Sequence, residues 1–249
     1  MEFALIIALS LLFITQTRGQ DPKYCDPSLC MIVRRKHIGC PGVAVNQCGS
    51  DGFTEIPMNS TLKEKILYKH NFYRNQLAGG NLTGLTALLP ATRMPTYEWD
   101  DELSYLAQIN ANQCKFGHDE CRSTKNFPFA GQNIAWSRNA RSHEAAIERA
   151  IDSWWQEFNV TSQSDIDAFQ PGQHIIGHFT AMAQDRSNRV GCAASFYNKA
   201  ERYVVCNYGY SNFQGEKVYE SGTTASGCTT GTNPTFPNLC STQEVVHPW

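Results

Sequence analysis

No charge of either sign dominates this sequence, since 21 lysine and arginine residues stand against 23 aspartate and glutamate residues, a formal net charge of −2. A protein that binds nucleic acid normally has a basic excess or a basic stripe, because cations neutralise the phosphates. The chain has neither, so we expect no nucleic acid partner. The composition of a disordered protein is also missing: 41% of the 249 residues are hydrophobic, enough to bury the core of one domain with appendages.

Long apolar runs are missing too, apart from residues 3–14, which are interrupted only by Ser10. This run is too short to cross about 30 Å of hydrocarbon as a helix. The small residues Thr17 and Gly19 follow it at the spacing that a signal peptidase recognises. We therefore expect residues 1–19 to be a signal peptide, the rest to contain no transmembrane segment, and the protein to be secreted to the extracellular space. Three sequons fit this prediction as N-glycosylation sites, at Asn59, Asn81 and Asn159.

Cysteine is less dense than in small scaffolds that depend on disulfides, because ten residues are spread over the whole chain. Their even number indicates bridges that reinforce a core in an oxidising compartment. Four lie in a Gly-, Pro- and Asn-rich extension over residues 20–59, and four lie in a body over residues 60–213. The last two, Cys228 and Cys240, lie in a tail over residues 214–249, whose Thr, Gly, Pro and Ser content predicts irregular structure.

The body combines helical and strand patterns. Thr61 and Glu64 form a capping-box pattern, and apolar residues then repeat at helical spacing as far as Gly79-Gly80. Asp100 can cap a second helix that runs toward Cys114, and a third helix is expected from about residue 142 to residue 158. Strand candidates are residues 133–136, 178–183, 189–196 and 202–208. This content predicts the α+β class, with helices packed on a mainly antiparallel sheet.

The last two strand candidates can be paired from their cysteines. The midpoint of Cys192 and Cys206 is residue 199, inside the turn-like segment 198–201. A hairpin centred there places the two cysteines opposite each other, at a separation that a disulfide can span. Closing that loop would stabilise the fold by roughly 3 kcal/mol. We therefore predict this bridge from the spacing.

Several motifs together resemble the CAP superfamily, which groups cysteine-rich secretory proteins, antigen 5 and plant pathogenesis-related-1 proteins. The stretch Gly177–Met182 resembles its first signature, and Tyr203–Tyr208 resembles its second. The match spans about residues 60–213. Further matching positions are His70-Asn71 with Arg74, Gly131–Ala135, and Trp154 with Glu157. The four cysteines before residue 59, with Ala111–Cys114 and Phe116–His118, resemble the insect antigen 5 branch.

The resemblance implies a three-layer α-β-α sandwich with a mainly antiparallel central sheet, stabilised by disulfides. Its bridge pattern implies Cys25–Cys40, Cys30–Cys121, Cys48–Cys114 and Cys192–Cys206, and leaves Cys228 and Cys240 as a pair in the tail. If all ten cysteines form bridges, none is available as a nucleophile or a metal ligand.

The resemblance also implies a cleft with two histidines and two acids, which map to His118, Gln132, Glu157 and His178. Gln132 stands where one acid is expected, and an amide neither accepts a proton at neutral pH nor supplies a negative charge. Glu157 could act as a base, but no serine or cysteine nucleophile has a recognisable setting, so we predict no catalytic residue. His118, His178 and Glu157 form a candidate zinc or copper site, although no cofactor is required. In the alternative interpretation, the histidines are hydrogen-bonded residues that orient Glu157.

Three other features allow a structural interpretation. His174 and His178 have the spacing of a zincin helix, but no glutamate follows His174, and Gly177 with the β-like run after it argues against a helix. His70 falls on the apolar stripe of the first helix and is expected in the core. The basic run at residues 34–37 is either a solvated loop or a displayed contact surface.

The favoured function is that of a secreted, monomeric and non-enzymatic protein, similar to the antigen 5 allergens of insect saliva or venom. It would bind a small lipid, a divalent metal or a host protein. The alternative is an enzyme, either a copper- or zinc-dependent redox catalyst similar to superoxide dismutase or a weak protease. A channel-blocking toxin would need a six-cysteine module after the second signature, where only two cysteines follow, and no Arg-Gly-Asp motif supports integrin binding.

Overall fold

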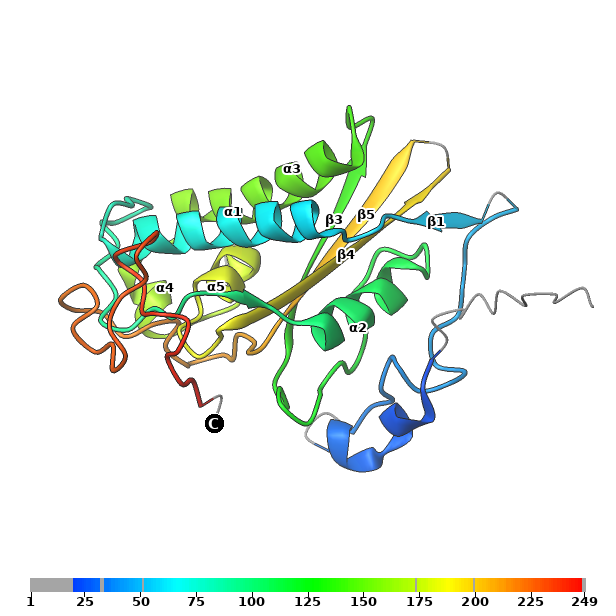
Figure 1. Ribbon diagram of the computed structural model, residues 1–249, viewed down its shortest axis with the longest axis horizontal. Coiled ribbons are helices and arrows are strands. Elements are labelled where there is room, and N and C mark those ends of the chain that lie inside the picture. Colours follow the sequence, from blue (N-terminus) through cyan, green and yellow to red (C-terminus); the bar gives the residue numbers. More distant parts are fainter. Residues whose placement is uncertain (1–19, 32–33, 51, 173, 199, 248–249) are drawn as a thin grey trace, which may run out of the picture.

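A five-stranded sheet lies at the centre of the computed structural model, which describes residues 20–31, 34–50, 52–172, 174–198 and 200–247 (Figure 1). The expected signal peptide lies outside these residues. The main path of the sheet has the order β1-β4-β5-β3, with antiparallel neighbours throughout. These strands are β1 (Phe53–Glu55), β4 (Arg189–Tyr197), β5 (Glu201–Tyr208) and β3 (Gly131–Arg138), and the short β2 (Glu98–Trp99) pairs in parallel with the start of β4.

Helices cover both faces of this sheet. On one face lie α1 (Ser60–Ala78), α3 (His143–Trp155) and α5 (Gly177–Ala183), and on the other lies α2 (Asp101–Ala111) (Figure 1). Alternate residues of each strand serve the two layers: Val204 packs in the first core, and Val205 packs under α2. The predicted α+β class and the three-layer arrangement are confirmed. The remaining elements are α4 (Gln163–Asp167) and the 3₁₀ turns at Pro22–Cys25, Pro27–Cys30 and Gln156–Val160.

The helix boundaries agree only in part with those predicted from the local sequence. Asp100 caps α2 by accepting the Leu103 N–H at 2.8 Å, as predicted. The capping box at residues 61 and 64 is wrong, because α1 begins at Ser60 and Asn59 is its cap, accepting the Leu62 N–H at 2.9 Å. The third helix ends at Trp155, and the expected continuation to residue 158 is a 3₁₀ turn.

The strand predicted at residues 178–183 is wrong, because these residues lie in α5. The cause is a remote helix cap: the Glu157 carboxylate accepts the backbone N–H groups of His178 at 2.9 Å and Phe179 at 3.0 Å. A helix start has N–H groups without partners inside the helix, and a carboxylate there is favourable. Glu157 lies about 20 residues upstream, outside the local sequence pattern.

All five disulfides agree with the predicted pairing. Cys192 and Cys206 are direct partners across the β4–β5 hairpin, with a Cα–Cα separation of 4.0 Å. The pairs implied by the family resemblance are present, and so is Cys228–Cys240 in the tail. None of the described cysteines is free. The N-terminal extension is therefore linked covalently to the region after α2, through Cys121 and Cys114.

Two buried polar residues of α1 connect the helix to the sheet and to the loops beyond it. His70 is fully buried, as predicted: its Nδ1 donates to the Ile66 carbonyl at 2.8 Å, and its Nε2 lies 3.1 Å from the Tyr208 hydroxyl. Arg74 is also fully buried, and its guanidinium lies 4.0 Å from the centre of the Tyr97 ring. The guanidinium donates to four backbone carbonyl oxygens, those of Pro95, Met182, Gln184 and Ser187.

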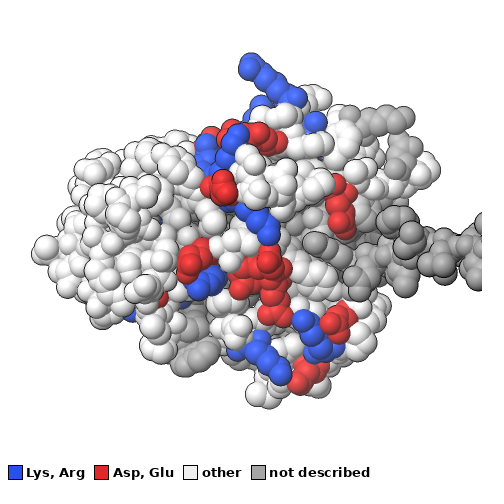
Figure 2. All heavy atoms as spheres, in the orientation of Figure 1, with Lys and Arg blue, Asp and Glu red and all other residues white. Residues whose placement is uncertain are grey.

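Two segments that meet at one end of the molecule contain no charged residue. Residues 75–92 and 221–243, which we call the uncharged end, contain no Lys, Arg, Asp or Glu and pair at Ala91 and Ser221. This end forms the white left side of the space-filling view, while charged side chains gather across the middle (Figure 2). The exposed sequon residue Asn81 lies on it. None of the described helices is long and apolar enough to span a membrane.

Candidate functional site

The first half of the candidate site is a histidine held by a carboxylate. His178 lies in the first turn of α5, and its Nδ1 is 2.6 Å from Oε1 of Glu157. A carboxylate only accepts hydrogen bonds, so Nδ1 carries the proton and the lone pair of the neutral ring is on Nε2. The other Glu157 oxygen accepts the two backbone N–H groups that begin α5. Glu157 therefore orients His178 and caps its helix at the same time.

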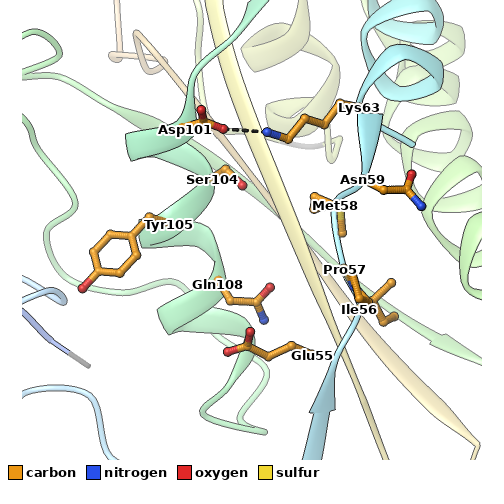
Figure 3. Close-up of a pocket in the computed structure, with 10 residues that line it drawn as sticks. All are labelled: Glu55, Ile56, Pro57, Met58, Asn59, Lys63, Asp101, Ser104, Tyr105 and Gln108. Atoms are coloured by element: carbon orange, nitrogen blue, oxygen red, sulfur yellow. Dashed lines mark hydrogen bonds and ion pairs between the residues drawn. The ribbon is translucent and has the colours of Figure 1, made fainter. Parts of the chain in front are cut away.

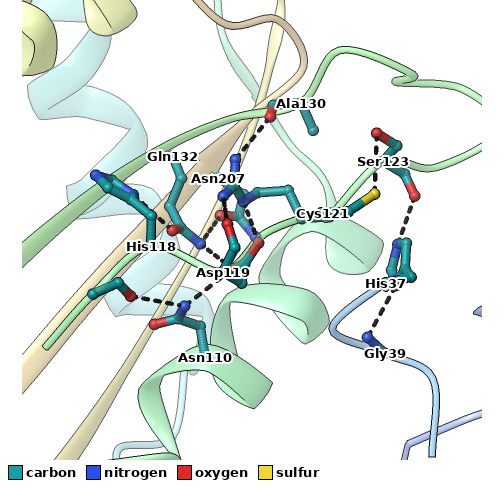
Figure 4. Close-up of polar contacts among 12 residues, drawn as sticks. His37, Gly39, Asn110, His118, Asp119, Cys121, Ser123, Ala130, Gln132 and Asn207 are labelled. Carbon is teal, nitrogen blue, oxygen red and sulfur yellow. Dashed lines mark hydrogen bonds and ion pairs between the residues drawn. The ribbon is translucent and has the colours of Figure 1, made fainter. Parts of the chain in front are cut away.

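The second half is a histidine held by an amide. His118 lies in the loop after α2, and its Nδ1 is 2.9 Å from Oε1 of Gln132 on β3 (Figure 4). Burial lowers the pKa of His118, and the nearby His178 and Arg122 lower it further. The ring is therefore neutral at physiological pH. Adjacent residues of β3 contact the two histidines: Gln132 binds the His118 ring, and Asn133 donates to the backbone carbonyl of His178. The histidines are therefore close enough for His178 to affect the pKa of His118.

A buried polar network that the sequence analysis did not predict supports the Gln132 amide (Figure 4). Gln132 Nε2 donates to Asp119 Oδ2 at 2.6 Å and to Asn207 Oδ1 at 3.0 Å. The Asp119 side chain is 3% exposed, and its other oxygen accepts Arg122 Nε at 2.7 Å. Asn110 donates to Asp119 as well. The only sequence signal for Asp119 was its position directly after His118, which does not distinguish a buried acid from a surface one.

The predicted metal-ligand set is thus arranged as two oriented histidines. Among the described residues, no three His, Cys, Asp or Glu side chains form a group that could hold a metal ion. Both oxygens of Glu157 are hydrogen-bonded, whereas Nε2 of each imidazole is left as a donor atom for a ligand. Catalytic zinc sites usually have three protein ligands. Two imidazoles are fewer protein ligands than such a site has.

An aromatic groove between α1 and α3 is a separate candidate for binding. This α1–α3 groove encloses about 550 Å³ and is lined by Thr61, Glu64, Lys65, Tyr68, Lys69, Phe72, Tyr73 and Glu148. Tyr68 is 58% exposed and Phe72 is 40% exposed, and their rings stack with centroids 6.2 Å apart. Tyr73 packs flat on Trp155 at 5.0 Å, which makes its position rigid. Exposed aromatic rings on an otherwise polar helix surface indicate a contact surface.

A second groove lies between α2 and the segment that joins β1 to α1 (Figure 3). It encloses about 630 Å³. Its lining is charged at both ends and apolar between them. Lys63 and Asp101 form an ion pair at one end, Glu55 lies at the other end, and Met58 lies between them. The α1–α3 groove differs in its exposed aromatic rings, Tyr68 and Phe72, which make it the better candidate for an apolar ligand.

The fold agrees with the comparisons with known proteins. The model of the cysteine-rich secretory protein family, CAP, matches residues 67–208, and the chain belongs to this family. A venom allergen-1 from Aedes albopictus is 39% identical over 236 residues, which cover 90% of this chain and 89% of that protein. An antigen 5 like allergen from Culicoides nubeculosus is 39% identical over 199 residues, 75% of this chain and 89% of that protein. Within the family, the chain belongs to the antigen 5 branch.

The solved structures support the same fold. The crystal structure of NaASP2 with Zn2+ superposes with a TM-score of 0.65 at 27% sequence identity, covering 78% of this chain and all of that one.

Proposed function

We propose that this chain is a secreted, non-enzymatic lipid-binding protein of the antigen 5 type, which holds a single acyl chain in the α1–α3 groove. The observation that carries this proposal is the exposed Tyr68–Phe72 aromatic pair beside a rigid Tyr73–Trp155 stack. Burying such rings against an apolar chain yields roughly 25 cal/mol per Å² of apolar surface. Five disulfides and the antigen 5 relatives support secretion, because such bridges persist in oxidising compartments.

The charges around the groove favour an apolar ligand over a multiply charged one. Lys65 and Lys69 at the rim are paired with Glu144 and Asp152, and Glu64 and Glu148 also line the groove. The cations are therefore already neutralised by protein carboxylates. A fatty acid or another lipid with a single acyl chain would bind mainly through its hydrocarbon part, with the headgroup in water at the rim.

Native mass spectrometry of the secreted protein, followed by displacement of a fluorescent fatty acid probe, tests this function. We expect the double variant Tyr68→Ala/Phe72→Ala to lose probe binding at least tenfold. The matched control is Leu85→Ala/Leu89→Ala, which removes two other exposed apolar side chains from the uncharged end. Equal binding by wild type and the aromatic double variant would refute the groove as the lipid site.

We propose labile zinc or copper binding as a second function, supported by the two imidazoles with unprotonated Nε2 atoms. His118 and His178 would be the ligands, and Gln132 and Glu157 would orient them from behind. Isothermal calorimetry with zinc and copper, on wild type and on His118→Ala/His178→Ala, measures this. The same heat of binding in both proteins would exclude these histidines.

A further inference from the structure

The amide at position 132 stands where the family pattern has an acid, and this raises the question of what orients His118. The directions of the hydrogen bonds answer it. Asn207 Nδ2 donates to the backbone carbonyl of Leu103 at 3.1 Å, so Asn207 Oδ1 points to Gln132. Asp119 can only accept, so it too faces the Nε2 side of the amide. Two acceptors on one side fix the amide orientation and direct Gln132 Oε1 to His118.

This orientation determines where the His118 proton lies. Gln132 Oε1 accepts, so His118 Nδ1 must donate, and the lone pair of the neutral ring is on Nε2. We infer that Asp119 is the positioning residue for His118, acting through the Gln132 amide and replacing the acid that the family pattern expects at position 132. As a statement about the site's use, this inference rests on the proposed role of His118 as a metal ligand.

The two halves of the site then have the same design. Glu157 contacts His178 directly. Asp119 reaches His118 through one intervening amide, that of Gln132 (Figure 4). Arg122 neutralises the buried Asp119 charge and also donates to the backbone carbonyls of Asp119 and Ala130. Both imidazoles carry their proton on Nδ1, and both leave Nε2 for a ligand. Partners of this kind typically change metal affinity by 10- to 100-fold.

The test uses the metal-free, disulfide-intact protein and long-range ¹H–¹⁵N correlation spectra of its histidine rings at pH 8. We expect wild-type His118 to be the Nδ1–H tautomer. In Asp119→Asn, the remaining side-chain oxygen is expected to stay with Arg122 Nε, so the new NH₂ faces the Gln132 amide and turns it around against the single remaining acceptor, Asn207 Oδ1. The His118 proton should then move to Nε2 while His178 keeps its own on Nδ1. Zinc affinity should fall 10- to 100-fold in the same variant.

Glu244→Gln is the matched control, because Glu244 in the tail is also a fully buried carboxylate paired with an arginine, Arg93. It should leave the His118 tautomer and zinc affinity unchanged. An Nε2–H tautomer in wild type overturns the inference even if Asp119→Asn does not fold. An unchanged tautomer in folded Asp119→Asn overturns it as well. Correct tautomers without zinc binding would refute the proposed metal function and leave the positioning role intact.

Discussion

Replacing Glu157 by alanine should destabilise the protein by about 3 kcal/mol. Glu157 accepts three hydrogen bonds, one from the His178 ring at 2.6 Å and two from the backbone at the start of α5. Hydrogen bonds to a charged group contribute about 1.5–3 kcal/mol each. His178 is 28% exposed, so water can replace part of this loss. With a urea m value of about 2 kcal/mol/M, the unfolding midpoint should fall by about 1.5 M.

Urea unfolding with the disulfides intact, followed by tryptophan fluorescence, measures this effect, since Trp154 stacks near His178 at 6.1 Å. Glu157→Gln should lie between wild type and Glu157→Ala, because its amide oxygen can still accept the two backbone N–H groups. Glu220→Ala is the control, because it removes an exposed ion pair with Lys217 and should cost less than about 0.5 kcal/mol. If Glu157→Ala and Glu220→Ala are equally stable, Glu157 does not hold α5.

Three further outcomes are expected. Arg74→Met removes the donors of four buried carbonyl groups and should cost on the order of 4 kcal/mol in the same urea assay; a loss below about 1 kcal/mol would contradict the contacts described. Burial lowers the pKa of His70 to about 4, so between about pH 6.5 and pH 4 the unfolded chain binds a proton that the native state does not. Stability should therefore decrease as the pH is lowered from about 6.5 to 4, and His70→Gln should show a shallower dependence of stability on pH. Equal slopes in the two proteins would rule His70 out as the cause. In protein secreted from eukaryotic cells, removing a used sequon should lower the intact mass by one glycan, and an unchanged mass would show that the sequon is unused. The variants are Thr61→Ala, which keeps the Asn59 helix cap, Asn81→Gln and Asn159→Gln.

The elements that could be predicted from the sequence are those whose cause is local. Asp100 caps a helix through the Leu103 N–H three residues later, and the β4–β5 hairpin follows from the positions of Cys192 and Cys206. In each case the interacting groups lie within one turn or across one tight loop. The edge strand β1 was not predicted, because three residues show no period and pair only through the distant β4.

The candidate site shows the opposite case, because its contacts join distant segments. His118, Gln132, Glu157 and His178 were identified through the family resemblance, and the structure brings them together as two pairs. Their roles were not predictable. Glu157 caps α5, a helix that begins about 20 residues later, at residues for which the sequence pattern predicted a strand. Asp119 follows His118 directly, yet its side chain is turned into the interior toward β3. A one-dimensional pattern does not contain these directions.

The amide at position 132 can itself be tested by restoring the acid. In Gln132→Glu a second carboxylate would lie where Gln132 Nε2 now lies 2.6 Å from Asp119 Oδ2. Two carboxylates at this distance cannot both ionise, so the pKa of one rises. The native state would then bind a proton that the unfolded chain releases above about pH 4.3, and stability would fall as pH rises. We expect a larger loss at pH 8 than at pH 5, opposite in direction to the His70 effect.

Asp119→Asn combined with Gln132→Glu should recover most of this loss, because one carboxylate and one amide again share the hydrogen bond. The coupling between the two positions, measured as a double-mutant cycle at pH 8, should be favourable by about 1–3 kcal/mol. Additive losses would mean that Asp119 and position 132 do not interact in solution. Strong coupling would mean that the buried Asp119 requires an amide at position 132. The replacement of the expected acid by Gln132 would then not indicate that the site has lost its function.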